Sequence, residues 1–137
     1  MNKNLIFTLS LFGLAMAFAT ISLIPSKVEP IVWIIIFLFC AWTIAKKVKS
    51  NYFLHGFLVS IVNSVWITAV HIWFFGAYMN HHPEMNQMSS GMPLANHPRL
   101  MMLLTGPLFG AVCGLILGLL CILAAKMVGS SSQKASG

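Results

Sequence analysis

Four long runs without a charged residue constrain the fold of this chain more than any other feature. A helix needs about 20 apolar residues, each rising about 1.5 Å, to cross roughly 30 Å of hydrocarbon. Of the 137 residues, 58% are apolar and 7% are charged, whereas soluble domains carry about 25% charged residues. We therefore predict an all-α, polytopic membrane protein with four transmembrane helices in two antiparallel hairpins. The predicted spans cover residues 5–24, 31–45, 52–79 and 100–125.

The first two spans leave alternatives open. The second run is only fifteen residues long, which also fits a re-entrant segment. Trp33 and Trp42 stand near its two ends, as interfacial aromatic residues do, and favour a short true span. The first run also fits a signal peptide, because Lys3 precedes an apolar stretch with small residues at 15–19. The apolar run continues to Ile24 without a polar segment, which favours an uncleaved span.

The distribution of charged residues predicts an orientation. Lysine and arginine accumulate in the short cytoplasmic loops of membrane proteins. With both termini inside, six of the eight basic residues lie on the inner side, and only Lys27 and Arg99 lie outside with Glu29 and Glu84. We predict a cell membrane protein, of the bacterial inner-membrane kind, with both termini cytoplasmic. Residues 1–128 form the four-span domain, residues 80–99 an outer loop, and residues 129–137 a disordered cytoplasmic tail.

Sequence patterns of catalysis are missing. The chain has no Asp for a Ser-His-Asp triad and no H-E-x-x-H motif. Cys40, Cys113 and Cys121 fall inside predicted spans and form no C-x-x-C pair. A net charge of +6 from eight basic and two acidic residues is too sparse for a nucleic-acid partner. We predict a non-enzymatic protein with a structural or accessory role in the membrane.

The fourth run carries a glycine zipper, in which Gly106, Gly110, Gly114 and Gly118 repeat every four residues. Residues at this spacing share one helix face, and glycines let a second helix approach closely. We expect this face to pack within the chain, for example on the small residues of the first run. A homo-oligomer or another membrane protein is the alternative partner for the glycine face, in addition to the lipid bilayer.

The third run is the polar one. Its polar residues fall within an arc of about 140° when they are placed at 100° per residue. Side chains of this kind tie helices together by hydrogen bonds, or they line a polar path for a solute or a proton. Both interpretations apply to the same five residues: Ser60, Asn63, Ser64, Thr68 and His71.

The predicted outer loop is rich in methionine and histidine. Thioether and imidazole ligands suit monovalent copper, and imidazole also suits zinc. The methionine spacing resembles the methionine-rich outer segments of copper transporters, which also carry Met-x-x-x-Met within a span, a motif that no span has here. Binding or transport of copper, zinc or a small solute is therefore the alternative function, and an ordinary polar surface loop is the simpler interpretation. We expect no other cofactor. The candidate ligands are His81, His82, Met85, Met88, Met92 and His97.

Overall fold

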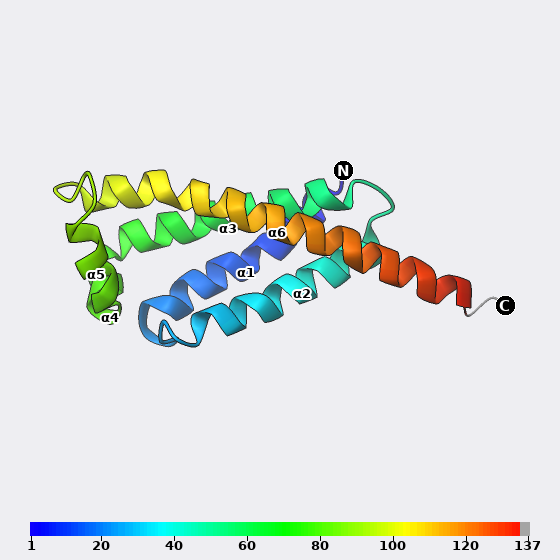
Figure 1. The fold of residues 1–137 in the computed structure, drawn as a ribbon, viewed down its shortest axis with the longest axis horizontal. Helices are drawn as coiled ribbons and strands as arrows, with labels where there is room; N and C mark the ends of the chain where they lie inside the picture. Colours follow the sequence, from blue (N-terminus) through cyan, green and yellow to red (C-terminus); the bar gives the residue numbers. More distant parts are fainter. Residues whose placement is uncertain (135–137) are drawn as a thin grey trace.

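The computed structural model describes residues 1–134, which form helices and no strands (Figure 1). The all-α prediction is confirmed. Four of the helices are long and apolar enough to cross a membrane, and they are α1, α2, α3 and the segment from residue 98 to 129 of α6. The helices are α1 (Lys3–Ser22), α2 (Glu29–Lys47), α3 (Tyr52–Trp73), α4 (Phe75–His81), α5 (Pro83–Ser90) and α6 (Pro98–Lys134).

Helix α2 is longer than the uncharged run that predicted it. It has 19 residues, with Glu29 and Pro30 in its first turn and Lys46 and Lys47 in its last. A proline fits the first turn, where its missing N–H is not needed, and these charges have the signs that the helix dipole favours. The residues that bounded the uncharged run therefore lie inside the two ends of the helix. Helix α2 is thus long and apolar enough to cross a membrane.

Helix α3 ends earlier than predicted. The expected span of residues 52–79 stops at Trp73, because Phe74 leaves helical geometry with φ −100° and ψ 34°. The chain then starts the separate helix α4, which packs on α1. Tyr78 falls within the predicted span of residues 52–79, and it is instead a buried residue of α4. Its ring stacks on the rings of His71 and His82.

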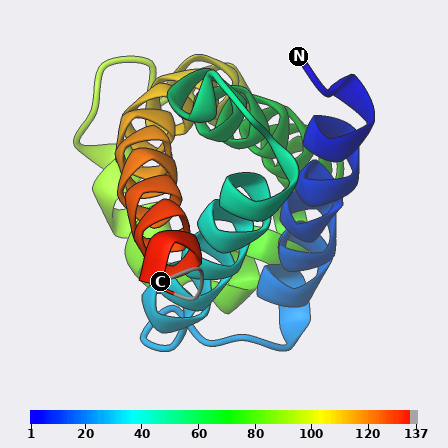
Figure 2. The ribbon, with the colours of Figure 1, turned by 90° about the vertical axis from the view of Figure 1, so that its right-hand side faces the viewer.

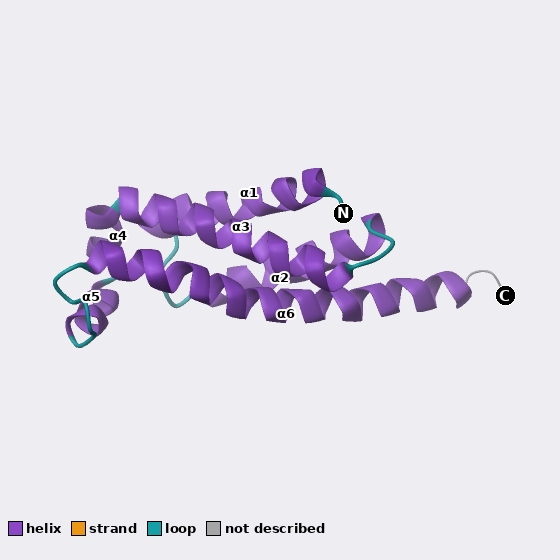
Figure 3. Ribbon diagram, turned by 90° about the horizontal axis from the view of Figure 1, so that it is seen from above, coloured by secondary structure: helices purple, strands orange, loops and turns teal. Residues whose placement is uncertain are grey.

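The four long helices form a bundle in which α3 and α6 make the most extensive contact. Helix α3 also packs on α1, whereas α2 packs chiefly on α6, and α1 and α2 touch each other only sparsely. Viewed along the bundle, α1 and α6 lie on opposite sides (Figure 2). Helices α4 and α5 lie at the end of the bundle away from the first residues of α1 (Figures 1 and 3). Helix α3 is thus the element that joins α1 to α6.

The apolar core lies in the half of the bundle where α1 begins. It brings together Leu9 of α1, Ile44 of α2, Val59 of α3 and Leu117 of α6. The outward faces are also apolar, which suits contact with lipid rather than with water. On α2 the large exposed side chains share one helix face and are Ile31, Ile34, Ile35, Leu38, Phe39 and Trp42.

Helix α6 runs through the start of the predicted tail. It continues to Lys134, whereas disorder was predicted from Gly129 onward. A single glycine costs a helix about 1 kcal/mol relative to alanine, and adding a residue to an existing helix is far easier than starting one. Residues 129–134 of the predicted tail therefore belong to α6 in the structure. Residues 135–137 lie outside the described part of the chain.

The glycine face of α6 lies against α3. Gly110, Gly114 and Gly118 are buried, and a side chain at any of them would collide with α3. A homo-oligomer through this face would require α3 to be displaced. From Gly106 to Gly118, an added β-carbon would meet Thr68, Ser64, Phe57 and Phe53 in turn.

Substitution of Gly110 by leucine is expected to separate α3 from α6. Overfilling a close contact usually costs 1–3 kcal/mol, so we expect Gly110→Leu to lower the free energy of unfolding by at least about 2 kcal/mol. The matched control is Gly129→Leu, because a β-carbon at Gly129 meets no atom within 4 Å. Thermal unfolding in mild detergent measures the difference. Equal unfolding midpoints for the two variants would contradict the packing described here.

Candidate functional site

The polar residues of α3 that face α6 contact the glycine face. The Ser60 hydroxyl donates a hydrogen bond of 2.9 Å to the carbonyl of Gly110. The Ser64 hydroxyl donates within its own helix to the carbonyl of Ile61 at 2.8 Å, and it lies where a side chain on Gly110 would stand. Thr68 is placed in the same way against Gly106. These three residues of the predicted stripe are buried between two helices of the same chain.

The remaining polar residues of the stripe face α1. The Trp66 indole N–H donates to the Ser10 hydroxyl at 3.3 Å. Asn63 lies against Gly13, where an added β-carbon would stand 2.5 Å from its Oδ1 atom. Both amide atoms of Asn63 are buried and have no hydrogen-bond partner among the described residues. A buried polar group without a partner costs about 1–3 kcal/mol, so Asn63 is the one member of the stripe that destabilises the packing.

A stack of three rings lies at the opposite end of the bundle from the start of α1. His71 of α3 stacks on Tyr78 of α4 with ring centroids 4.0 Å apart, and Tyr78 stacks on His82 at 4.5 Å. The three residues are buried. Nε2 of His71 lies 3.0 Å from the hydroxyl of Thr20, which donates to the carbonyl of Ala17. The stack therefore connects the ends of α3 and α4 to the end of α1.

A carboxylate faces the last ring of this stack. Nδ1 of His82 lies 3.2 Å from the carbonyl of Tyr78, so it is the nitrogen that donates a hydrogen. Nε2 of His82 is buried without a hydrogen-bond partner and lies 3.9 Å from Oε2 of Glu29. The indole N–H of Trp33 donates to the other oxygen of Glu29 at 3.4 Å. A proton on Nε2 would place a charged imidazolium beside this carboxylate.

The electrostatics of this end favour a neutral phenol. Burial, followed by the negative charges of Glu29 and Glu84, raises the pKa of Tyr78 to about 12. A hydrogen bond from Ser26 is the main cause that lowers the pKa of the exposed Glu84 carboxyl, which stays ionised at neutral pH. Among the described residues, the stack thus brings two imidazole rings, one phenol and one carboxylate together at this end of the bundle. We define the candidate site by Thr20, Glu29, His71, Tyr78 and His82.

The sequence assigned the members of this site to different features. The sequence places His71 in the polar stripe, His82 among the candidate metal ligands, and Tyr78 near the end of the predicted third span. Thr20 and Glu29 were not considered as parts of a site with them. The spacing 71, 78 and 82 repeats at seven and four residues, which is the spacing of one helix face. This periodicity is the signal in the sequence that groups the three residues. It was missed because His82 was assigned to the predicted loop of residues 80–99.

The structure buries one of the six predicted metal ligands and leaves the others exposed, although the rings of His81 and His82 lie 5.5 Å apart. His82 is buried in the ring stack, whereas His81, Met85, Met88 and His97 are exposed. Among the described residues, no three His, Cys, Asp or Glu side chains lie close enough to hold a metal ion. A cavity of about 320 Å³ between α4, α5 and the start of α6 is lined by Met79 and by none of the predicted ligands. Copper or zinc binding therefore stays a prediction from the sequence.

Comparisons with protein-family models, with curated proteins and with solved structures find no match for this chain.

The shifted ionisation of Tyr78 gives a testable pH dependence. The chain has two tyrosines, so a Tyr52→Phe variant isolates Tyr78, whose ultraviolet titration midpoint should lie at about pH 12 instead of 10.0. Glu29→Gln should lower this midpoint, because a carboxylate opposes formation of the phenolate.

The same shift has a consequence for stability. Because the folded protein raises this pKa, the contribution of Tyr78 is fully present below about pH 10 and is lost as the pH rises through about 12. The control for Glu29→Gln in the tyrosine titration is Lys27→Gln, which removes a charge and leaves both acidic residues in place. A Tyr78 midpoint near 10 in the folded protein would contradict the burial of the stack.

Proposed function

We propose that this chain is an integral membrane protein of four spans, arranged as two hairpins, with a structural or accessory role and no catalytic activity. One observation carries the proposal, which is that the polar stripe of α3 contacts α1 and α6 of the same chain. Within the stripe, Ser60 bonds to Gly110 of α6 and His71 bonds to Thr20 of α1. Polar side chains in a membrane tie helices together in this manner.

The exposed faces of the long helices support membrane insertion. Large apolar side chains are exposed along α1, α2 and α6, where a water-soluble bundle would carry polar residues. Trp42 is half-exposed near the end of α2, and Nζ of Lys46 lies 5.1 Å from the centre of its ring. Tryptophan and lysine are typical of the interface between lipid and water. A bilayer is therefore the partner that covers these faces.

The distribution of charged residues supports a cytoplasmic location for both termini of the chain. Lys3, Lys47 and Lys49 gather where α1 begins and α2 ends. Both acidic residues, Glu29 and Glu84, belong to the opposite end. Under the positive-inside rule the lysine-rich end faces the cytoplasm. We propose a location of the bacterial inner-membrane kind on this basis.

Labelling of introduced cysteines tests this orientation. Gly91 follows α5 and Gly129 lies near the end of α6, and neither is packed closely by other atoms. In intact cells a membrane-impermeant maleimide should label Gly91→Cys and should label Gly129→Cys only after the membrane is opened. The chain without added cysteines is the control for its three native thiols. Labelling of Gly129→Cys in intact cells would reverse the proposed orientation.

Proton flux distinguishes the structural role from a polar path through α3. A path would use His71 as its ionisable group, whereas a structural role uses it to join α3 and α4 to α1. We expect liposomes that contain the purified protein to take up protons no faster than empty liposomes, as measured with an internal pH-sensitive dye.

The variant His71→Ala gives the matched comparison. Removing the ring should weaken the contact with Thr20 and Tyr78 and lower the unfolding midpoint, with no change in flux. Proton flux in the original protein that is abolished by His71→Ala, while the variant remains folded, would overturn the structural proposal in favour of a proton path.

A further inference from the structure

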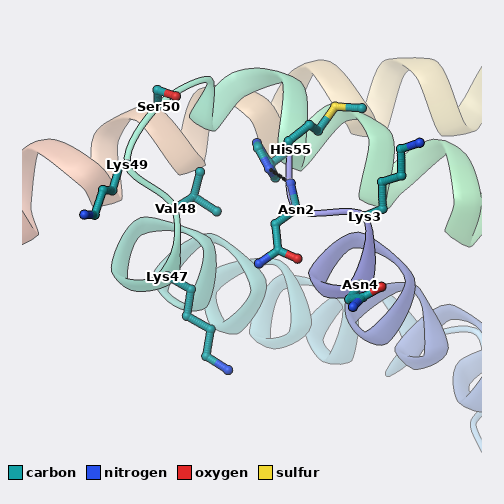
Figure 4. Close-up of a pocket in the computed structure, with 9 residues that line it drawn as sticks. Asn2, Lys3, Asn4, Lys47, Val48, Lys49, Ser50 and His55 are labelled. Atoms are coloured by element: carbon teal, nitrogen blue, oxygen red, sulfur yellow. Dashed lines mark hydrogen bonds between the residues drawn. The ribbon is translucent and has the colours of Figure 1, made fainter.

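A basic pocket lies at the end of the bundle where α1 begins and α2 ends. It has a volume of about 590 Å³, within the usual range for ligand sites. Lysines stand on three sides of it: Lys3 at the start of α1, Lys47 at the end of α2, and Lys49 in the connection to α3 (Figure 4). None of the residues that line the pocket is acidic.

The centre of the pocket is held by a neutral histidine. His55 is buried, and its Nε2 atom accepts a hydrogen bond of 3.0 Å from the backbone N–H of Asn2. Its Nδ1 atom lies 2.9 Å from the carbonyl of Asn51 and donates to it. Because one ring nitrogen accepts and the other donates, the imidazole is uncharged and fixed in orientation. The pocket thus has a polar floor that two hydrogen bonds hold in place, with lysine side chains around it.

No acidic side chain lies beside this pocket in residues 1–134, the part of the chain that the structure describes. The only two acidic residues of the sequence are Glu29 and Glu84, which lie with α2's first turn and α5 at the other end (Figure 1). Lys3, Lys47 and Lys49, which we call the rim lysines, point in different directions away from Asn2 and His55 (Figure 4). Helices α1 and α3 also begin here, and the dipole of a helix is positive at its first turn.

We propose that this pocket binds the phosphate group of an anionic phospholipid headgroup, with Lys3, Lys47 and Lys49 folding over it. This rests on the membrane insertion proposed above, which puts the lysine-rich ends of the helices at the depth of the headgroups. Basic pockets between spans on the cytoplasmic side suit such headgroups, and each lysine near an anionic surface adds to the attraction. A soluble phosphate shares the same chemistry.

Lipid retention measured by native mass spectrometry tests the proposal. The protein is exchanged into micelles that contain equal amounts of phosphatidylglycerol and phosphatidylcholine. The rim variant carries Lys3→Gln, Lys47→Gln and Lys49→Gln. The matched control carries Lys27→Gln, Lys46→Gln and Lys126→Gln, which remove the same charge from residues that do not line the pocket. We expect the original protein and the control to retain phosphatidylglycerol preferentially, and the rim variant to retain at least about tenfold less.

Equal retention of phosphatidylglycerol by the rim variant and the control would overturn the proposal, and so would equal retention of the two lipids by the original protein. In lipid-free detergent, inorganic phosphate that raises the unfolding midpoint of the original protein but not of the rim variant would support the phosphate site and identify a soluble source. Lys49→Gln alone, in the connection outside the helices, serves if the triple variant does not fold. Flotation of the protein with liposomes measures membrane insertion separately from lipid retention. The floated fraction should be equal for the rim variant and the matched control.

Discussion

Hydrocarbon offers no hydrogen bonds, so a polar side chain that enters it is stabilised by a partner inside the protein. Helix α3 carries the largest share of such side chains, and the bundle is arranged around it. Its serines and threonine face the glycines of α6, and its asparagine, tryptophan and histidine face the small residues of α1. The position of α3 between these two helices follows from this requirement, because neither neighbour alone covers an arc of about 140°.

The glycines make this arrangement sterically feasible. Hydroxyl groups on α3 occupy the space that side chains at Gly106 and Gly110 would fill. The resulting close approach brings the Ser60 hydroxyl within hydrogen-bond distance of a backbone carbonyl on α6. On the other side, Gly13 admits Asn63, although its amide finds no partner there. Small and polar residues on facing helices are thus complementary parts of one contact.

Sequence reasoning predicted the parts of this fold that depend on composition along a single helix. Uncharged runs located the four long helices, and the spacing of four identified the glycine face of α6. Contacts between residues on different helices were harder to predict. For example, the contact between Thr20 and His71 depends on how α1 and α3 cross. The end of α3 at Phe74 carried no strong local signal, since only Gly76 weakens an otherwise aromatic and apolar stretch. The ring stack was missed for the same reason, because Tyr78 and His82 were assigned to other elements.

The length of α6 exceeds what a bilayer requires. Its 37 residues correspond to about 55 Å of helix, against roughly 30 Å of hydrocarbon. Lys126 is the first charged residue after the apolar run, and the helix continues for eight residues beyond it, or about 12 Å. The close contact along the glycine face fixes the direction of α6 relative to α3. With the bundle inserted as proposed above, the last turns of α6 extend beyond the headgroups and set a distance from the membrane for whatever contacts them in the water phase.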